Sequence, residues 1–110
     1  MRIYTLVVGP IQTNCYIVSD EETKETIIID AGENAKNIFN FVLEKDLNVK
    51  YIISTHGHFD HVNGVPEIKE KLKAPFYLND KDAYMLSPSA ATFMRTCGYD
   101  FKAMEIDGYL

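Results

Sequence analysis

The chain has 110 residues, which is enough for one small domain. Apolar residues make up 46%, with seven Tyr and six Phe, so the composition excludes a disordered chain and supports one hydrophobic core. The net charge is −5 and Lys and Arg never form a block, which argues against a nucleic-acid partner. No apolar run is long enough to span a membrane.

The N-terminal third carries three strand patterns. Residues 2–8 alternate and are β-branched, residues 14–20 repeat the pattern, and residues 26–30 return after a polar turn. Together they predict an antiparallel meander. Met1-Arg2 leads directly into the first strand rather than into an apolar signal segment, so we expect a cytoplasmic protein.

The two cysteines, Cys15 and Cys97, lie far apart and match no zinc-ribbon spacing. In a cytoplasmic protein we expect them to be two reduced thiols rather than a disulfide. A nucleophilic thiol needs a base, and every histidine lies in another segment, so a structural role is favoured for Cys97.

Helical and strand patterns alternate through the rest of the chain, which predicts an α/β sheet whose middle strands are parallel. Asn63 is expected to open one of the helices, with Pro66 in its first turn. The strand over 49–55 has a continuous apolar centre, typical of a strand buried on both faces. The remaining predicted elements are a helix over 34–45, a strand over 74–78, a helix capped by Asn79 or Asp80, and a helix over 89–96.

The end of the sequence has an unusual pattern. Residues 102–107 read as a strand, and Asp107-Gly108 is a strong hairpin signal. Only Tyr109 and Leu110 follow this predicted turn, so it lacks a returning strand. We therefore expect residues 1–110 to form a single partial domain that is truncated at its C-terminus.

All three histidines lie within six residues, directly after the apolar strand, in the spacing His56-x-His58-x-Asp60-His61. In an extended or loosely turned segment, side chains 56, 58 and 60 project to one side and His61 folds in beside them. Imidazole and carboxylate groups suit zinc, iron and manganese. The cluster therefore predicts a metal site at the carboxyl end of a parallel strand, where open α/β sheets usually bind ligands.

Two glycines frame this cluster. Gly57 would let the backbone turn sharply between the first two candidate ligands, and Gly64 would relieve the turn into the next helix. Three histidines brought together by chance on a surface loop are the alternative, but four potential ligands in six residues after an apolar strand favour the metal site.

The segment THGHFDHVNG resembles the HxHxDH signature of the metallo-β-lactamase superfamily. GPIQTNCYIV and IIIDAG also resemble the first strands of its glyoxalase II-like hydrolases. The resemblance implies an αββα sandwich, of which this chain supplies about the N-terminal half as a mixed sheet with flanking helices. His58 at the middle position argues against the flavodiiron branch of the superfamily, where that place is usually glutamate.

The resemblance also implies a site for one or two metal ions, zinc by preference, with iron or manganese as alternatives. His56 and His58 would bind the first metal, and Asp60 and His61 the second. Asp30 matches a family aspartate that supports the ligand loop without binding metal. Asp60 would orient or deprotonate a water whose pKa the metal lowers, for attack on an ester, thioester or amide carbonyl.

The family pattern requires further ligands downstream, and this sequence has no histidine after His61. The chain alone is therefore expected to be weak or inactive. An unpartnered sheet face would expose a large apolar surface, so we expect a homodimer or pairing with a missing C-terminal half.

The resemblance implies a hydroxyacylglutathione hydrolase-like enzyme acting on a small acyl or thioester substrate. The alternatives are an iron-dependent enzyme of the persulfide dioxygenase kind and a non-catalytic metal-binding or assembly module. A nuclease of the same superfamily is disfavoured by the acidic charge.

Overall fold

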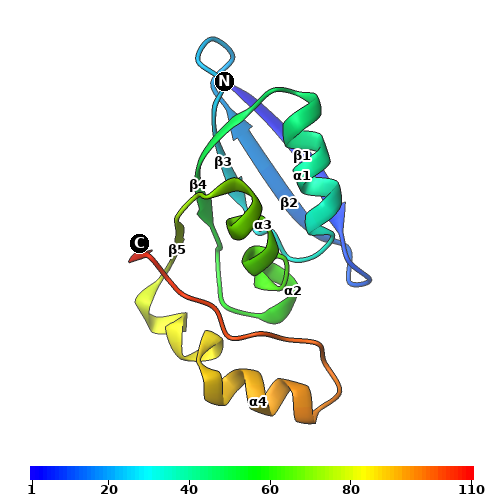
Figure 1. Ribbon diagram of the computed structural model, residues 1–110, viewed down its shortest axis with the longest axis vertical. Helices are drawn as coiled ribbons and strands as arrows, with labels where there is room; N and C mark the ends of the chain where they lie inside the picture. Colours follow the sequence, from blue (N-terminus) through cyan, green and yellow to red (C-terminus); the bar gives the residue numbers. More distant parts are fainter.

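The computed structural model describes residues 1–110 and is built on a six-stranded mixed sheet (Figure 1). The strands lie across the sheet in chain order, β1 (Arg2–Val8), β2 (Thr13–Ser19), β3 (Glu25–Ile29), β4 (Asn48–Ile53), β5 (Phe76–Leu78) and β6 (Gly108–Tyr109). Strands β1 to β3 pair antiparallel, and β3 to β6 pair parallel. The predicted N-terminal meander and the parallel middle strands are therefore confirmed.

Helices cover one face of this sheet and extend past its lower end (Figure 1). They are α1 (Ala35–Glu44), α2 (Phe59–Val62), α3 (Val65–Leu72), the 3-10 helix η1 (Asp80–Leu86) and α4 (Pro88–Thr96). In Figure 1, α1 and α3 lie in front of the strands, and η1 and α4 form a separate group below α2. None of these helices has the length and apolar character that a membrane span requires.

The hydrophobic core lies between the sheet and helices α1 and α3. Alternate residues of β2 point inward, as the period of a strand requires, and Ile17 is fully buried. Ile38 and Val42, four residues apart on α1, meet this face together with Ile68 of α3. The sheet side of the core is completed by Cys15, Ile28, Ile52, Phe76 and Leu78.

The opposite face of the sheet carries apolar side chains that nothing covers. Ile3, Val7, Tyr16 and Tyr51 share this face through the strand register, and their exposed fractions are 62%, 60%, 37% and 44%. The prediction that the strand after residue 48 is buried on both faces is therefore wrong. Helices pack on one side of β4 only, so Ile52 is buried while its neighbour Tyr51 faces outward.

The C-terminal segment differs from its prediction. Residues 102–107 form no strand, and Asp107-Gly108 forms no hairpin; instead β6 joins β5 in parallel. The Asp107 carboxylate accepts hydrogen bonds from Phe76 N at 2.8 Å and Lys69 Nζ at 2.7 Å. Asp107 N in turn donates to Phe76 O at 2.8 Å. These three contacts satisfy Asp107 without the turn that the dipeptide pattern indicated.

Most helix starts agree with the sequence patterns. The side chains of Asn79 and Ser87 cap η1 and α4 as N-cap residues, accepting from the backbone two or three residues on. Pro66 lies in the first turn of α3, as expected. Asn63 does not open that helix, because its backbone nitrogen donates to Phe59 O and ends α2 instead.

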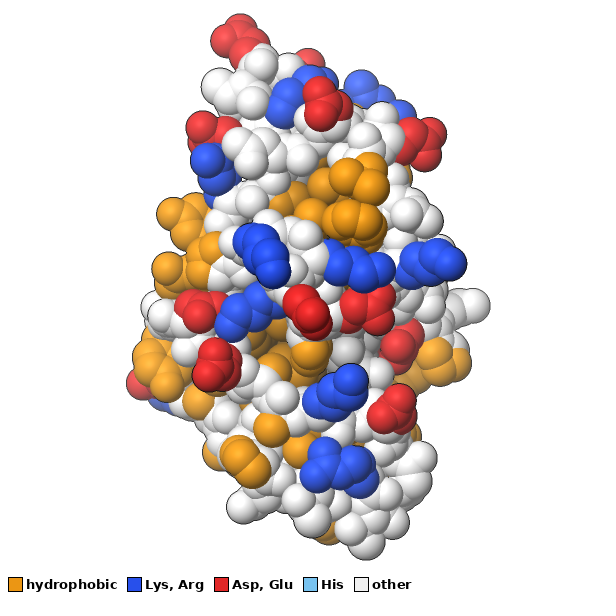
Figure 2. Space-filling model, in the orientation of Figure 1, with side chains coloured by type: hydrophobic (Ala, Val, Ile, Leu, Met, Phe, Trp, Pro, Cys, Tyr) orange, Lys and Arg blue, Asp and Glu red, His pale blue; other side chains and the backbone are white.

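Charged side chains are mixed on the face that Figure 2 shows. Lysines and arginines alternate with acidic residues there, and no area of one sign dominates. This view is consistent with the expectation, drawn from the sequence, that the chain has no nucleic-acid partner, which stays a prediction.

Candidate metal centre

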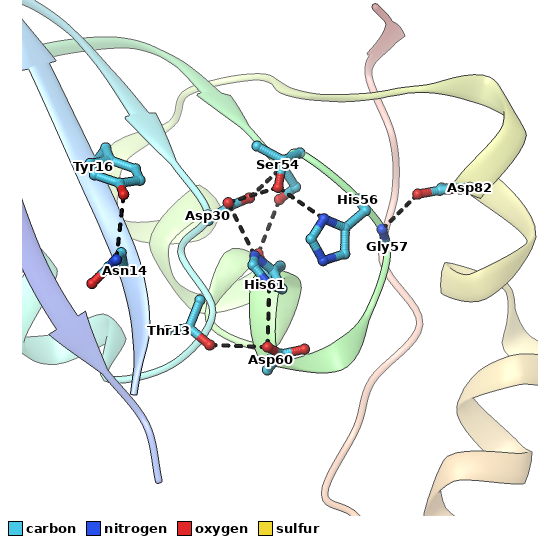
Figure 3. A network of polar contacts seen from close by, with 11 residues as sticks. Thr13, Asn14, Tyr16, Asp30, Ser54, His56, Gly57, Asp60, His61 and Asp82 are labelled. Atoms are coloured by element: carbon cyan, nitrogen blue, oxygen red, sulfur yellow. Dashed lines mark hydrogen bonds and ion pairs between the residues drawn. The ribbon is translucent and has the colours of Figure 1, made fainter. Parts of the chain in front are cut away.

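The histidine loop begins where β4 ends, and Asp30 at the end of β3 holds its first residue. Thr55 donates from its backbone nitrogen to Asp30 Oδ1 at 2.7 Å and from its hydroxyl to Asp30 Oδ2 at 2.8 Å. Asp30 is only 4% exposed and has a φ of 61°, in the left-handed region. A short polar side chain such as that of Asp30 is tolerated in this region. The two hydrogen bonds from Thr55 to Asp30 tie the ends of the parallel strands β3 and β4 together (Figure 3).

The loop bends at Thr55 and His56, is extended at His58 and then becomes helical. His58 is the N-cap of α2, and its carbonyl accepts from His61 N at 2.9 Å. Asp60 and His61 therefore lie on one helical turn, whereas the sequence led us to expect an extended or loosely turned segment with His61 folded in beside it. Ser54 Oγ donates to His61 O at 3.2 Å, which joins the end of this turn to the end of β4.

The three imidazole rings lie next to one another. The ring centroids of His56 and His61 are 3.8 Å apart, and those of His56 and His58 are 4.8 Å apart. His56 Nδ1 lies 3.0 Å from Thr55 Oγ1, which leaves its Nε2 available. The His58 side chain is exposed and makes no hydrogen bond or ion pair.

His61 lies between two carboxylates (Figure 3). Its Nε2 is 3.2 Å from Asp60 Oδ2, and its Nδ1 is 3.1 Å from Asp30 Oδ2. The buried Nδ1 has no partner in good hydrogen-bond geometry, so the Asp30 contact is close but poorly directed. Thr13 Oγ1 donates to Asp60 Oδ2 at 3.1 Å and holds that carboxylate against His61.

These residues fit a metal ion in their chemistry, although their donor atoms do not yet converge. No three His, Cys, Asp or Glu side chains are placed to hold one ion together. Asp30 nevertheless lies beside His61 Nδ1 at 3.1 Å, as a supporting carboxylate does in many metal sites, while His61 Nε2 lies 3.2 Å from Asp60, the other candidate ligand of the same ion.

The glycines of the loop are required for close packing rather than for turning. Neither Gly57 nor Gly64 has a positive φ, so the expected need for a sharp turn is not the reason for either. A Cβ on Gly57 would lie 3.0 Å from Asp82 O, and one on Gly64 would lie 2.7 Å from Ala31 O. Any larger residue would push the ligand loop away from its supports.

Two residues that hold the site were missed from the sequence. Asp82 Oδ2, in η1, accepts a hydrogen bond from Gly57 N at 3.0 Å, between the first two candidate ligands. Thr13, at the start of β2, contacts Asp60 from 47 residues away. Neither contact can be predicted from local spacing. Thr13 lies in GPIQTNCYIV, which indicated the family resemblance but no contact with Asp60.

The cysteines are free, as expected, and neither belongs to the site. Cys15 is in β2 and its side chain is buried in the core. Its pKa is raised to about 12, mainly by burial and to a smaller extent by the nearby Asp30 carboxylate. Cys15 therefore stays a protonated thiol near neutral pH and is a poor metal ligand. Cys97 is exposed at the end of α4.

Parallel strands that carry a loop with histidines and an aspartate at their carboxyl end indicate an α/β domain with a candidate metal site. The model of the metallo-beta-lactamase superfamily matches residues 8–107. The chain belongs to the metallo-β-lactamase superfamily, and its relatives place it among the glyoxalase II-like members.

Two relatives illustrate the match. A protein of Aquifex aeolicus (strain VF5) is 45% identical over 87 residues, which cover 79% of this chain and 40% of the relative. The hydroxyacylglutathione hydrolase GloC of Haemophilus influenzae is 35% identical over 86 residues, covering 77% of this chain and 40% of GloC. The chain thus spans about two fifths of the length of the curated relatives it matches.

Solved structures show the same fold. The BLEG-1 B3 metallo-beta-lactamase superposes with a TM-score of 0.87 at 29% identity, covering 99% of this chain and 53% of that one. TTHA1623, solved in a di-iron-bound form, gives 0.79 at 27% identity, covering 96% and 52%. The predicted family and fold class are therefore confirmed. Superfamily members bind divalent metals, which fits the donors found here.

Proposed function

We propose that this chain carries the metal-binding half of a hydrolase that cleaves thioester or related acyl bonds, like hydroxyacylglutathione hydrolases. The observation that carries the proposal is the loop from His56 to His61, with its three adjacent imidazole rings and one carboxylate at the carboxyl end of β4. The 35% identity to a hydroxyacylglutathione hydrolase supports the substrate class.

The four side chains would divide between two metal ions. His56 and His58 would hold the first ion and Asp60 and His61 the second, with zinc the preferred metal because imidazole suits it. Zinc in such a site supplies a water whose pKa is close to neutral. Asp60, which accepts a hydrogen bond from Thr13 Oγ1 at 3.1 Å, would orient that water and accept its proton.

The supporting residues would keep this geometry. Asp30 holds Thr55 at the start of the loop and lies 3.1 Å from His61 Nδ1, so it would support the His61 ring with Nε2 turned toward a metal. This is the role that the resemblance implied for Asp30.

We expect the 110-residue chain to hydrolyse thioesters slowly. It offers His56 and His58 to the first metal, whereas a catalytic zinc normally has three protein ligands. Its uncovered sheet face, which includes Tyr16 and Tyr51, would pack against a second copy or against a C-terminal half with a second sheet.

Two other functions share the same loop. An iron-dependent enzyme of the persulfide dioxygenase kind would use the same histidines, but the similarity to the hydroxyacylglutathione hydrolase GloC favours thioester hydrolysis. A non-catalytic metal-binding or assembly module would bind metal without turning over any acyl substrate.

The proposal is tested by measuring thiol release from S-lactoylglutathione with the zinc-loaded chain and with the zinc-free chain. We expect slow release that requires zinc and is lost in Asp60→Asn, with Asp100→Asn, an exposed aspartate outside the loop, as the matched control. Bound zinc with no release above the Asp60→Asn background would favour the binding module. Oxygen uptake on glutathione persulfide by iron-loaded chain would favour the dioxygenase.

A further inference from the structure

An apolar cavity of about 350 Å³ opens beside the histidine loop. It lies between the loop on one side and η1 and α4 on the other, so it is built by segments that meet only in the fold. His58 and Asp60 form its edge at the loop. The rest of the wall is mostly apolar and is contributed by Phe59, Tyr84, Met85, Phe93, Met94 and Phe101.

Away from the loop, the wall offers no charged side chain for an ionic ligand group to pair with. His58 and Asp60, at the edge, are the only lining residues with a histidine, basic or carboxylate side chain, and both are candidate metal ligands. A carboxylate or ammonium group pushed into the apolar part of this cavity, away from Asp60, would lose its hydration without gaining a partner. The volume lies at the lower end of the range for small-molecule sites, which suits one short apolar group.

The cavity is held open by contacts behind its wall. Phe59 packs on Tyr99 with ring centroids 4.8 Å apart, and Arg95 Nη1 donates to Phe101 O at 2.9 Å. These contacts fix the segment after α4 against the loop. Met85 and Met94 supply flexible, polarisable side chains that adapt to ligand shape.

We propose that this cavity binds the apolar acyl chain of the substrate, so that the enzyme prefers thioesters of unbranched aliphatic acids over those of small hydroxy acids. The proposal rests on the hydrolase function proposed above. A chain seated between Phe93 and Met85 would bring its carbonyl to His58 and Asp60, at the end of the cavity where the metal ligands lie.

Binding of non-hydrolysable thioethers tests this site without relying on turnover. S-methyl-, S-butyl- and S-hexylglutathione would be titrated into the zinc-loaded chain carrying 13C-methyl methionine, followed by NMR. We expect the Met85 and Met94 methyl signals to shift, while Met1 and Met104, which do not line the cavity, stay in place. Affinity should rise about fourfold for each methylene that becomes fully buried.

Two variants test whether the rise in thioether affinity per methylene comes from this cavity. Phe93 is 67% exposed, so Phe93→Ala should leave the fold intact while cutting the gain per methylene to below about twofold. Leu43→Ala on α1, 59% exposed and remote from the loop, is the matched control and should keep the full gain. A gain that is absent, or that Phe93→Ala leaves unchanged, overturns the proposal.

The two proposals fail separately in these measurements. Zinc-dependent release from S-lactoylglutathione with no chain-length effect on thioether affinity would keep the hydrolase function and remove the acyl pocket. Thioether affinity that rises with chain length and falls in Phe93→Ala, without hydrolysis of any thioester, would keep the pocket and remove the hydrolase.

Discussion

The carboxylate of Asp82 accepts a hydrogen bond from the backbone nitrogen of Gly57 at 3.0 Å, across 25 residues of sequence. Gly57 lies between two candidate metal ligands, and Asp82 belongs to η1, so this bond fixes the ligand loop from the side opposite Asp30 (Figure 3). The loop is thus held at Thr55 by one carboxylate and at Gly57 by another.

Asp82→Ala is therefore expected to weaken metal binding as well as the fold. It leaves the Gly57 N–H unpaired in a buried position, which costs about 1–3 kcal/mol, and it frees the backbone between His56 and His58. Zinc affinity should fall by about tenfold in competition with a chromogenic chelator. Asp80→Ala, an exposed neighbour in η1, should leave zinc affinity unchanged; equal losses in both variants would remove the positioning role of Asp82.

The candidate metal loop could be singled out in the sequence because its potential donors are close along the chain and have a distinctive spacing; that it binds metal stays a prediction. The strands over residues 2–8 and 14–20 were also readable, because alternation is local. Asp82 and Thr13 could not be found in this way, since their partners lie 25 and 47 residues away. The short β6 was misread because a dipeptide signal says nothing about a parallel neighbour such as β5.

The contribution of Asp107 to the stability of the folded chain should depend on pH. The hydrogen bond from Lys69, followed by that from Phe76 N, holds the pKa of Asp107 below its ordinary value of 3.8. The ionised group therefore stabilises the folded chain above that value, and its contribution is lost as the pH falls through the lower folded-state pKa. The amide shift of Phe76 should titrate with a midpoint below 3.8, and Asp107→Asn should abolish the titration. Asp100→Asn is the control, and a midpoint at or above 3.8 in the parent chain would contradict this account.

The two thiols should differ in reactivity. Burial raises the pKa of Cys15 to about 12, whereas Cys97 is exposed. Iodoacetamide at pH 8 should therefore modify the native chain once, at Cys97, because the thiolate is the reactive form. Peptide mass spectrometry checks the site, and denaturant should expose Cys15 as a second one. Modification of Cys15 in the native chain would show that the core around β2 opens readily.

The uncovered sheet face should drive self-association of the 110-residue chain. Ile3, Val7 and Tyr51 are between 44% and 62% exposed on this face, and their burial between two copies would remove apolar surface from water. Sedimentation equilibrium should show a dimer, and Tyr51→Lys should weaken it by on the order of tenfold or more. Leu43→Lys on the helix side of the molecule is the matched control. A parent chain that stays monomeric at high concentration removes the proposed pairing.

The most direct measurement is anomalous diffraction at the zinc absorption edge from crystals of the zinc-loaded chain. The account predicts density about 2.0–2.2 Å from ring nitrogens of His56 and His58, and a second peak at that distance from Asp60 and His61. Coordination of one ion by side chains of both pairs would still support a shared centre. If instead all four side chains remain apart, with zinc bound elsewhere or not at all, the metal centre and the hydrolase built on it are both contradicted.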